Sequence, residues 1–168
     1  MAQGAAYLGL GSNLGDRAAN LLAALAWLTA EGLVIDRLSS IYLTDPVGYS
    51  EQPSFLNMVA RCQIAGRHPW ELMRLCLETE LRLGRRREIP GGPRTIDIDI
   101  LLIDDWKGDE RRDGVDLTVP HPRMHERRFV LSPLAEIDPS VVHPVLGVTA
   151  MQLLDRLTDS AGVSLYVR

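Results

Sequence analysis

Cysteine is scarce in this 168-residue sequence, which contains only Cys62 and Cys76. Both lie within apolar runs, and their separation matches neither a close metal-ligand pair nor a redox motif. The sequence therefore predicts no disulfide framework. Buried free thiols of a protein in a reducing compartment are the better interpretation of these two residues.

Long hydrophobic runs and targeting signals are missing as well. No stretch reaches the roughly 18 to 20 apolar residues that span a bilayer, and the beginning, MAQGAAYLGLGSN, has neither a basic start nor an apolar run of signal length. We therefore expect a soluble, cytoplasmic protein without a membrane partner. Because 46% of the residues are hydrophobic, the chain can bury a sizeable core, so a single domain over residues 1–168 and a monomer are expected.

A general positive charge is also absent. The formal net charge is -4 and aromatic residues make up 5% of the chain, which argues against a nucleic-acid-binding protein. Lysine is rare, since 17 of the 18 basic residues are arginine, and ten of these arginines lie between Arg82 and Arg128. Genomic base composition explains the preference for arginine equally well. The clustering instead predicts a locally positive site within an acidic protein.

The first half of the chain has the hydrophobic periodicity of a strand, a helix and two further strands. AAYLGLG is typical of a strand, and residues 12–32 place leucines at helical spacing before Gly32. The β-rich run 33–44 and the alternating run 55–65 predict two consecutive strands.

The second half continues with a helix and a strand. The helix is expected to begin at Pro69 and to end at Gly84, and the run 92–103 contains the strand. The resulting β-α-β-β-α-β order predicts a ferredoxin-like α+β fold, in which helices lie on one face of an antiparallel sheet. A polar, hairpin-like stretch and a helix opened by a capping box, Thr149 to Gln152, form a C-terminal extension.

Two aspartates interrupt the apolar strand GPRTIDIDILLI. Since successive side chains of a strand point to opposite faces, Asp97 and Asp99 share one face, while Ile96, Ile98 and Ile100 fill the other. Neighbouring carboxylates repel each other unless a cation lies between them. Mg²⁺ takes one or two protein carboxylates and completes its shell with water and substrate phosphates, which matches this sparse ligand set. The alternative is a strand edge with solvated aspartates.

Basic side chains flank this pair in the sequence. Their planar or ring-shaped donors suit polyphosphate oxygens, and they are Arg85, Arg86, Arg87, Arg94, His121, Arg123, His125, Arg127 and Arg128. Together with a metal they indicate phosphoryl-type transfer. The segment GRRREIPGGPR alone is typical of a solvated basic loop, but its junction with the aspartate strand favours a lid that closes over a nucleotide.

Two further motifs carry little weight. His121 and His125 in HPRMH are a poor zinc site because no third nitrogen or sulfur ligand is at hand, so contact with a nucleotide is the better hypothesis. GLGSNLG lacks the Lys-Ser/Thr ending of a P-loop, and glycines between a strand and a helix often serve only the turn.

In order and spacing, five motifs together resemble the 6-hydroxymethyl-7,8-dihydropterin pyrophosphokinase family: YLGLGSNLGDR, SSIYLTDPVG, FLNMV, GPRTIDIDILL and LTVPHPRMHERRFVLSPLAEI. The resemblance covers about Tyr7 to Pro144. It implies an enzyme of folate biosynthesis that moves the β,γ-pyrophosphoryl group of ATP to the hydroxymethyl oxygen of 6-hydroxymethyl-7,8-dihydropterin and releases AMP. It also implies two Mg²⁺ ions held by Asp97 and Asp99, with catalysis mainly by positioning and charge neutralisation.

The resemblance assigns roles to individual residues. Arg85 and Arg87 match catalytic-loop arginines, and Asp99 is a candidate to accept the hydroxyl proton. The expected ATP contacts are Glu80, Arg94, Ile100, Thr118, His121 and Arg127. The expected pterin contacts are Thr44, Val47, Phe55, Asn57 and Phe129. Without the resemblance, the two phenylalanines would be assigned to the core and Asn57 to a strand edge.

Three departures from the family pattern predict altered affinity with an unchanged reaction. The loop GRRREIPGGPR is one residue shorter than is common, and Gly91 stands where many members carry tryptophan. Asp116 stands where some members have arginine, and Asp45 replaces a proline that is common beside the pterin.

Two other functions compete with this one. A magnesium-dependent phosphoryl or nucleotidyl transferase on another acceptor would share the aspartates and arginines, but it would release ADP or diphosphate instead of AMP. A ferredoxin-like nucleic-acid-binding module would use exposed aromatic residues, which the acidic charge and low aromatic content disfavour.

Overall fold

The computed structural model describes residues 4–86, 89–158 and 161–166. Its elements follow one another along the chain as β1 (Ala5–Ser12), α1 (Arg17–Ala30), β2 (Val34–Leu38), β3 (Tyr42–Thr44), β4 (Phe55–Gln63), α2 (Pro69–Arg82), β5 (Asp97–Ile103), β6 (Gly108–Arg112), β7 (Val115–Val119), the 3-10 turn η1 (Met124–Glu126), α3 (Arg128–Ile137), α4 (Ala150–Arg156) and β8 (Val163–Leu165).

The strands β5, β1, β4, β3 and β8 form the main antiparallel sheet in that order, and β2 pairs with β4 on the same side as β3. Antiparallel pairing of β1 with both β4 and β5, with α1 and α2 as the crossovers, is the ferredoxin-like arrangement. The predicted β-α-β-β-α-β core is therefore confirmed. The strands β6 and β7 form a separate hairpin at the position of the predicted polar hairpin.

Local signals set the ends of the two core helices. The side chain of Asp16 caps α1 by accepting a hydrogen bond from the Ala19 amide. At the start of α2, His68 and Glu71 form a capping box ahead of Pro69. Gly84 follows α2 with a φ of 79°, a left-handed conformation that suits glycine, so the predicted end of this helix is confirmed.

The β-rich run 33–44 is divided into β2 and β3 at Ser39. The buried Ser39 hydroxyl accepts a hydrogen bond from the Val59 amide and donates one to the Ser40 carbonyl. These bonds take the place of regular strand pairing between β2, which pairs with the second half of β4, and β3, which pairs with its first half. The single predicted strand is therefore two short strands on one edge of β4.

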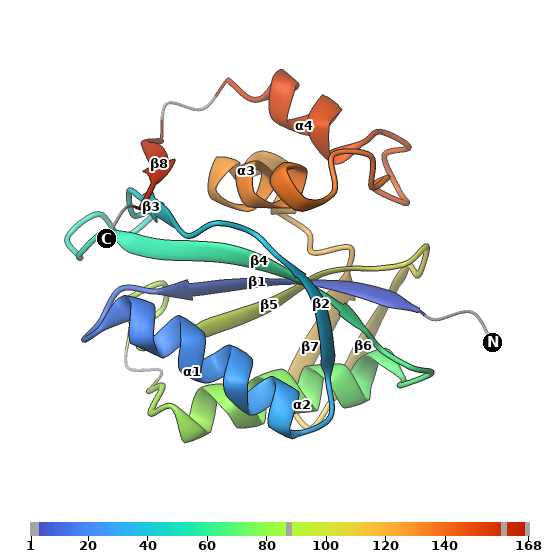
Figure 1. Ribbon diagram of the computed structural model, residues 1–168, viewed down its shortest axis with the longest axis horizontal. Helices are drawn as coiled ribbons and strands as arrows, with labels where there is room; N and C mark the ends of the chain where they lie inside the picture. The colour runs from blue at the N-terminus through green and yellow to red at the C-terminus, as the bar shows by residue number, and fades with distance from the viewer. Residues whose placement is uncertain (1–3, 87–88, 159–160, 167–168) are drawn as a thin grey trace.

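Two hydrophobic cores lie on opposite faces of the sheet, and Figure 1 shows α1 and α2 below it and α3 and α4 above it. The lower core includes Leu8, Leu10 and Ile98, while the upper core includes Val59 and Leu101 with the buried faces of α3 and α4. The prediction that helices lie on one face of the sheet is confirmed for the ferredoxin-like core, whose helices are α1 and α2. The C-terminal extension adds the second layer, and that layer helps to enclose the site.

Cys62 and Cys76 are buried and free, as the sequence predicts. Within the described residues, no helix has both the length and the apolar character needed to cross a membrane.

Candidate active site

Three neighbouring strands bring the predicted site residues together by register. On one side of Gly11 in β1 lies Asn57 of β4, and on the other lies Asp97 of β5. Two residues earlier in β1, Gly9 pairs with Asp99 in the same way. Because residues two apart in a strand share a face, the two aspartates and Asn57 point to the α3 side of the sheet.

Glycines in β1 provide the room that these side chains need. A Cβ atom at Gly11 would lie 2.5 Å from Oδ1 of Asn57, so a larger residue would displace this amide. A Cβ atom at Gly9 would meet the side chain of Leu101 at 3.4 Å. Gly9, Leu10 and Gly11, at the end of the first predicted strand, therefore form part of the floor of the site.

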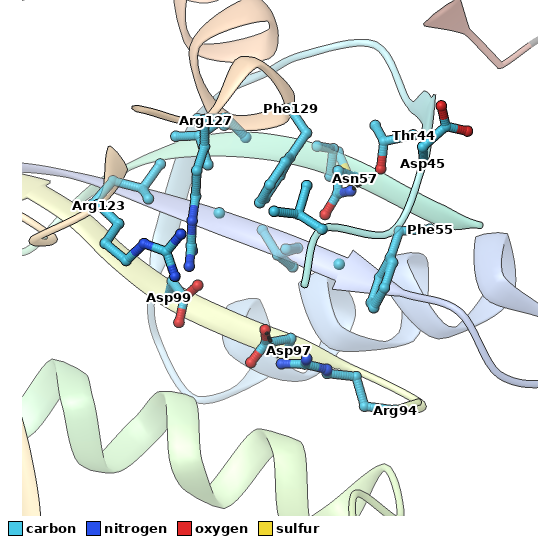
Figure 2. Close-up of a pocket in the computed structure, with 18 of the residues that line it drawn as sticks. Thr44, Asp45, Phe55, Asn57, Arg94, Asp97, Asp99, Arg123, Arg127 and Phe129 are labelled. Carbon is cyan, nitrogen blue, oxygen red and sulfur yellow. Dashed lines mark hydrogen bonds and ion pairs between the residues drawn. The ribbon is translucent and has the colours of Figure 1, made fainter. Parts of the chain in front are cut away.

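A cavity, here called the aromatic hollow, opens above this floor between β4, β5 and the start of α3 (Figure 2). The residues expected to contact a pterin line it together: Thr44, Val47, Phe55, Asn57 and Phe129. Phe55 and Phe129 reach the hollow from segments that are 74 residues apart in the chain. Flat apolar walls with a polar amide between them suit a planar heterocycle whose edge forms hydrogen bonds.

Hydrogen bonding fixes the orientation of the amide in this hollow. Nδ2 of the buried Asn57 donates to Oγ1 of Thr44 over 2.7 Å. The amide oxygen points past Gly11, where the absent Cβ leaves it space. Asn57 is therefore held by β3 and not by contacts along its own strand.

A second cavity, here called the arginine hollow, lies on the other side of the aspartates. Its polar lining comes from α2, the loop after it, β5 and the residues that flank η1, and consists of Glu80, Arg85, Arg94, Asp97, Asp99, His121 and Arg127. Asp97, Asp99, Arg94 and Arg127 line both hollows. The aspartates therefore stand at the boundary between an aromatic compartment and a basic one.

Asp97 is the centre of an ion-pair network. Its two carboxylate oxygens accept hydrogen bonds from Nη1 of Arg85 over 2.6 Å and from Nη1 of Arg94 over 2.7 Å. Arg85 also pairs with Glu80, whose carboxylate accepts the Ile98 amide over 2.7 Å. The network places Arg85 and Arg94 beside the aspartates and supplies positive charge there.

Among the described residues, Asp99 has no cation as close as those that pair with Asp97. Burial, followed by the repulsion of Asp97, raises the pKa of Asp99 to about 7, although Arg127 and Arg85 oppose this shift. The nearest basic ring atom, Nε2 of His121, is 3.9 Å from its carboxylate. A carboxylate with a raised pKa indicates that additional positive charge would be stabilised at this position.

His121 is neutral near pH 7. Burial, together with the repulsion of Arg127, lowers its pKa to about 4. Its Nδ1 atom accepts the Arg123 amide over 3.1 Å, so the proton of the neutral ring lies on Nε2, which faces the arginine hollow. His121 can therefore donate a hydrogen bond to an anionic oxygen there without adding charge.

The environment of Arg127 favours the binding of an anion. Burial is the main cause that lowers the pKa of its guanidinium below the usual range, and Arg123 acts in the same direction while Asp99 opposes it. Its Nε is buried and has no hydrogen-bond partner among the described residues. The guanidinium also lies 5.6 Å from the centre of the Phe129 ring, as Arg94 does from that of Phe55. Each aromatic wall therefore adjoins an arginine.

Two predicted site residues stand apart from the two hollows. Ile100 is buried in the lower core, and Thr118 is exposed on β7. Neither is among the described residues that line the aromatic or the arginine hollow. Arg87 lies outside the described residues.

Asn13 and Gln52, which were not among the predicted site residues, connect the loops around the site. The Asn13 side chain accepts the Arg94 amide over 2.8 Å and donates to Oε1 of Gln52 over 2.9 Å. Gln52 in turn donates to the Gly91 carbonyl over 3.0 Å. The signal that was available is the polar pair SN at the end of an apolar strand, since buried polar groups require partners.

The donor set fits a hard divalent cation with few protein ligands. Within the described part of the chain, no group of three or more His, Cys, Asp or Glu residues is arranged to hold a metal. The carboxylates of Asp97 and Asp99 share one face of β5, and burial, followed by the repulsion of Asp97, raises the pKa of Asp99. Two carboxylates beside a basic hollow match Mg²⁺ that shares its shell with water and phosphate oxygens.

Comparison with known proteins gives one family. The model of the family described as 7,8-dihydro-6-hydroxymethylpterin-pyrophosphokinase matches residues 7–139. The 2-amino-4-hydroxy-6-hydroxymethyldihydropteridine pyrophosphokinase of Bacillus subtilis (strain 168) is 50% identical over 133 residues, or 79% of this chain and 77% of that protein. The protein of the same name from Methylorubrum extorquens is 42% identical over 159 residues, or 94% of this chain and 96% of that protein.

Longer proteins contain a similar segment. The folic acid synthesis protein fol1 of Schizosaccharomyces pombe is 41% identical over 163 residues, and this chain spans only 21% of it. The crystal structure of Plasmodium falciparum HPPK-DHPS wild type with SDX-DHP has a TM-score of 0.75 with 16% identity, over 91% of this chain and 44% of that one. At this identity the likeness shows a shared fold.

Proposed function

Since the chain belongs to the 7,8-dihydro-6-hydroxymethylpterin-pyrophosphokinase family, we propose that it transfers the pyrophosphoryl group of ATP to the hydroxymethyl oxygen of 6-hydroxymethyl-7,8-dihydropterin. The products are AMP and the pterin diphosphate, in a step of folate biosynthesis. In this proposal the pterin occupies the aromatic hollow and the ATP triphosphate occupies the arginine hollow.

The observation that carries the proposal is the position of Asp97 and Asp99 at the boundary of the two hollows. A transfer between two substrates requires that the acceptor oxygen and the transferred phosphorus meet. The aromatic walls and the Asn57 amide lie on one side of the aspartates, and the arginines and His121 lie on the other. The acceptor oxygen and the β-phosphorus would therefore meet over β5.

In this proposal Asp97 and Asp99 are the residues that would hold two Mg²⁺ ions. When bound, the metal neutralises phosphate charge and orients the polyphosphate. The chain prepares its side of this arrangement by placing both carboxylates on one strand face. The Asp97 carboxylate is paired with both Arg85 and Arg94. The two guanidinium groups are therefore within reach of polyphosphate oxygens that approach this carboxylate.

The basic residues stabilise negative charge on the transferred group. Arg85, Arg94 and Arg127 supply guanidinium donors, and His121 supplies a neutral N–H group. Since the arginines are already held by ion pairs and packing, little reorganisation is needed when charge develops on the phosphate oxygens. Asp99 borders both hollows and is the candidate to receive the hydroxyl proton.

The proposal is tested by incubating the protein with ATP, Mg²⁺ and 6-hydroxymethyl-7,8-dihydropterin and then separating the nucleotides. AMP in the complete mixture, matched by pterin diphosphate and absent without the pterin or the metal, is the expected result. Formation of ADP or diphosphate instead would favour a transferase with another chemistry or another acceptor. No turnover by the folded protein would contradict the proposed substrates.

A further inference from the structure

The end of β3 is tied to a segment that lies more than a hundred residues later in the chain. The Asp45 amide donates to the Gly162 carbonyl over 3.0 Å, and the Gly162 amide donates to Oδ2 of Asp45 over 3.0 Å. These reciprocal bonds use both the backbone and the carboxylate of Asp45. A proline at this position would have neither the N–H group nor the carboxylate.

The bonds at Asp45 continue the pairing of a whole strand. In β8, Val163 pairs with Thr44 and Leu165 pairs with Tyr42, while the Tyr166 amide donates to the Ile41 carbonyl over 2.9 Å. The strand β8 thus covers the outer edge of β3 from residue 41 to residue 45. Without β8, the backbone groups on this side of β3 would lack these sheet partners.

This edge is also a wall of the aromatic hollow. Thr44 and Asp45 both line the hollow, and Thr44 accepts the hydrogen bond that orients the Asn57 amide. Figure 2 shows Asp45 next to Thr44 with its carboxylate turned away from Asn57. Gly162 is therefore hydrogen-bonded to Asp45, Asp45 follows Thr44 in the chain, and Thr44 is hydrogen-bonded to Asn57.

Residue 162 is suited to this contact because it has no side chain. A Cβ atom there would lie 2.5 Å from Oδ2 of Asp45 and 3.2 Å from its Cγ. Any larger residue would push the carboxylate away from the Gly162 amide. Asp45 and Gly162 therefore form a matched pair, because the carboxylate bond of Asp45 requires a residue without a side chain at position 162.

We propose that Asp45 is a positioning residue for the acceptor, which together with Gly162 fastens the C-terminal strand across the edge of β3 and so fixes Thr44 and the Asn57 amide. The inference rests on the proposed function, because it takes the aromatic hollow as the pterin pocket. It assigns to the C-terminal strand, which lies beyond the family motifs, a role in acceptor affinity.

The test measures two affinities for each full-length variant by calorimetry, one for 6-hydroxymethyl-7,8-dihydropterin and one for a non-hydrolysable ATP analogue with Mg²⁺. Asp45→Ala removes the carboxylate bond, and Asp45→Pro removes both bonds. We expect Asp45→Ala to weaken pterin binding about 3-fold and Asp45→Pro about 10-fold, the range of one to two partly exposed hydrogen bonds. Nucleotide affinity should stay within error, and the unfolding temperature should fall by only a few degrees, since the lost bonds hold an edge strand.

Two controls define the origin of the effect. Asp45→Asn keeps an acceptor oxygen and the backbone N–H group, so it should bind pterin like the wild type. Asp109→Asn removes a comparable charge from β6, outside both hollows, and should change neither affinity. Amide hydrogen exchange at Gly162 should speed up in Asp45→Ala but not in Asp45→Asn, which reports the broken bond without any ligand.

A double-mutant cycle tests the matched pair. Gly162→Ala alone should weaken pterin binding about as much as Asp45→Ala, and it should add nothing to Asp45→Ala because the displaced carboxylate is already gone. Additive losses would overturn the pairing. Unchanged pterin affinity in Asp45→Ala and Asp45→Pro would overturn the inference, as would equal losses for pterin and nucleotide with a lower unfolding temperature. If the wild type binds the nucleotide but no pterin, the proposed function fails first and this inference fails with it.

Discussion

The two faces of β5 make opposite contributions to the protein over the same few residues. Ile98 and Ile100 of β5, and Ile96 immediately before it, face the lower core and are each no more than 4% exposed. Asp97 and Asp99 alternate with them, and their side chains are 23% and 38% exposed at the hollows. One face therefore removes apolar surface from water, and the other keeps carboxylates close enough to repel each other.

The energetic difference between these faces is large. Full burial of an isoleucine side chain contributes about 1.5–3 kcal/mol to folding. The Asp99 carboxylate instead acts against the folded state near neutral pH, since burial and Asp97 raise its pKa to about 7. A strand designed for stability alone would not place these carboxylates together. We infer that the charge at β5 serves binding, and that the apolar face of the same strand offsets its cost in folding free energy.

The largest expected effect comes from removing a charge on the site face. Asp97→Asn or Asp99→Asn should lower turnover by at least about 10³-fold, since loss of a metal ligand removes several kcal/mol of transition-state stabilisation. Asp99→Asn should leave the free energy of unfolding unchanged or raise it, because it relieves repulsion from Asp97. Steady-state kinetics and urea unfolding of the same preparations measure both quantities. Turnover within tenfold of the wild type would contradict the role of these aspartates as metal ligands, and with it the contrast between the two faces of β5.

A change on the core face should give the reverse pattern. Ile96→Ala should lower the free energy of unfolding by about 2–5 kcal/mol, because the fully buried side chain leaves a cavity. Turnover per folded molecule should stay close to that of the wild type at a temperature where the variant remains folded. The milder Ile96→Val, with a loss of about 0.5–1.5 kcal/mol, is the matched control. A loss of turnover without a loss of stability would contradict the division between the faces.

An intermediate effect is expected at the edge of the arginine hollow. Arg85→Ala should lower turnover about a hundredfold, the order found for one electrostatic donor, and should change ATP affinity less. Arg74→Ala, on the exposed side of α2, serves as the control and should have neither effect. Pre-steady-state kinetics separate binding from chemistry. Weaker ATP binding with unchanged turnover would limit Arg85 to ground-state binding.

The smallest effect concerns the layer that covers the site face. Burial alone would raise the pKa of Glu136, but hydrogen bonds from Tyr42 and Ser40 outweigh it and lower the pKa below its usual value of 4.5. The bonds between α3 and β3 therefore stabilise the fold above about pH 4.5, and this contribution is lost as the pH falls through the folded-state pKa. Because Glu136 is exposed, the loss should stay below about 1 kcal/mol.

Urea unfolding between pH 3 and pH 7 measures this contribution. Glu136→Gln should remove it, so the stability of the variant should fall less than that of the wild type on acidification. An equally steep fall in both proteins would assign the pH dependence to other carboxylates.

The core fold could be predicted from the sequence because its signals are local. Alternation in β5, the cap at Gly84 and the leucine spacing of α1 each depend on neighbours within a few residues. The helix α3 could not be recognised in the same way, since Pro133 lies inside it and the preceding motif contains further prolines. Its position over the upper face depends on packing against Val59 and Leu101, which are distant in the sequence.

The sequence allowed us to predict which residues form the site better than how these residues are arranged in space. The aspartates, the arginines and the phenylalanines could be singled out, and the structure brings most of them together. The register that aligns Asn57, Gly11 and Asp97 depends on the pairing of three strands, which no local pattern specifies. The same reason explains why the links through Asn13 and Asp45 were missed, since each joins segments that are far apart in the chain.

The central claim is that the site face of β5 holds the metal ions of the reaction. The most direct measurement is a crystal structure of the chain with a non-hydrolysable ATP analogue and Mn²⁺, whose anomalous signal identifies the ions. We predict two peaks within about 2.0–2.3 Å of the Asp97 and Asp99 carboxylate oxygens. Metal peaks bound only to the nucleotide, with Asp97 still paired to Arg85 and Arg94, would contradict the claim.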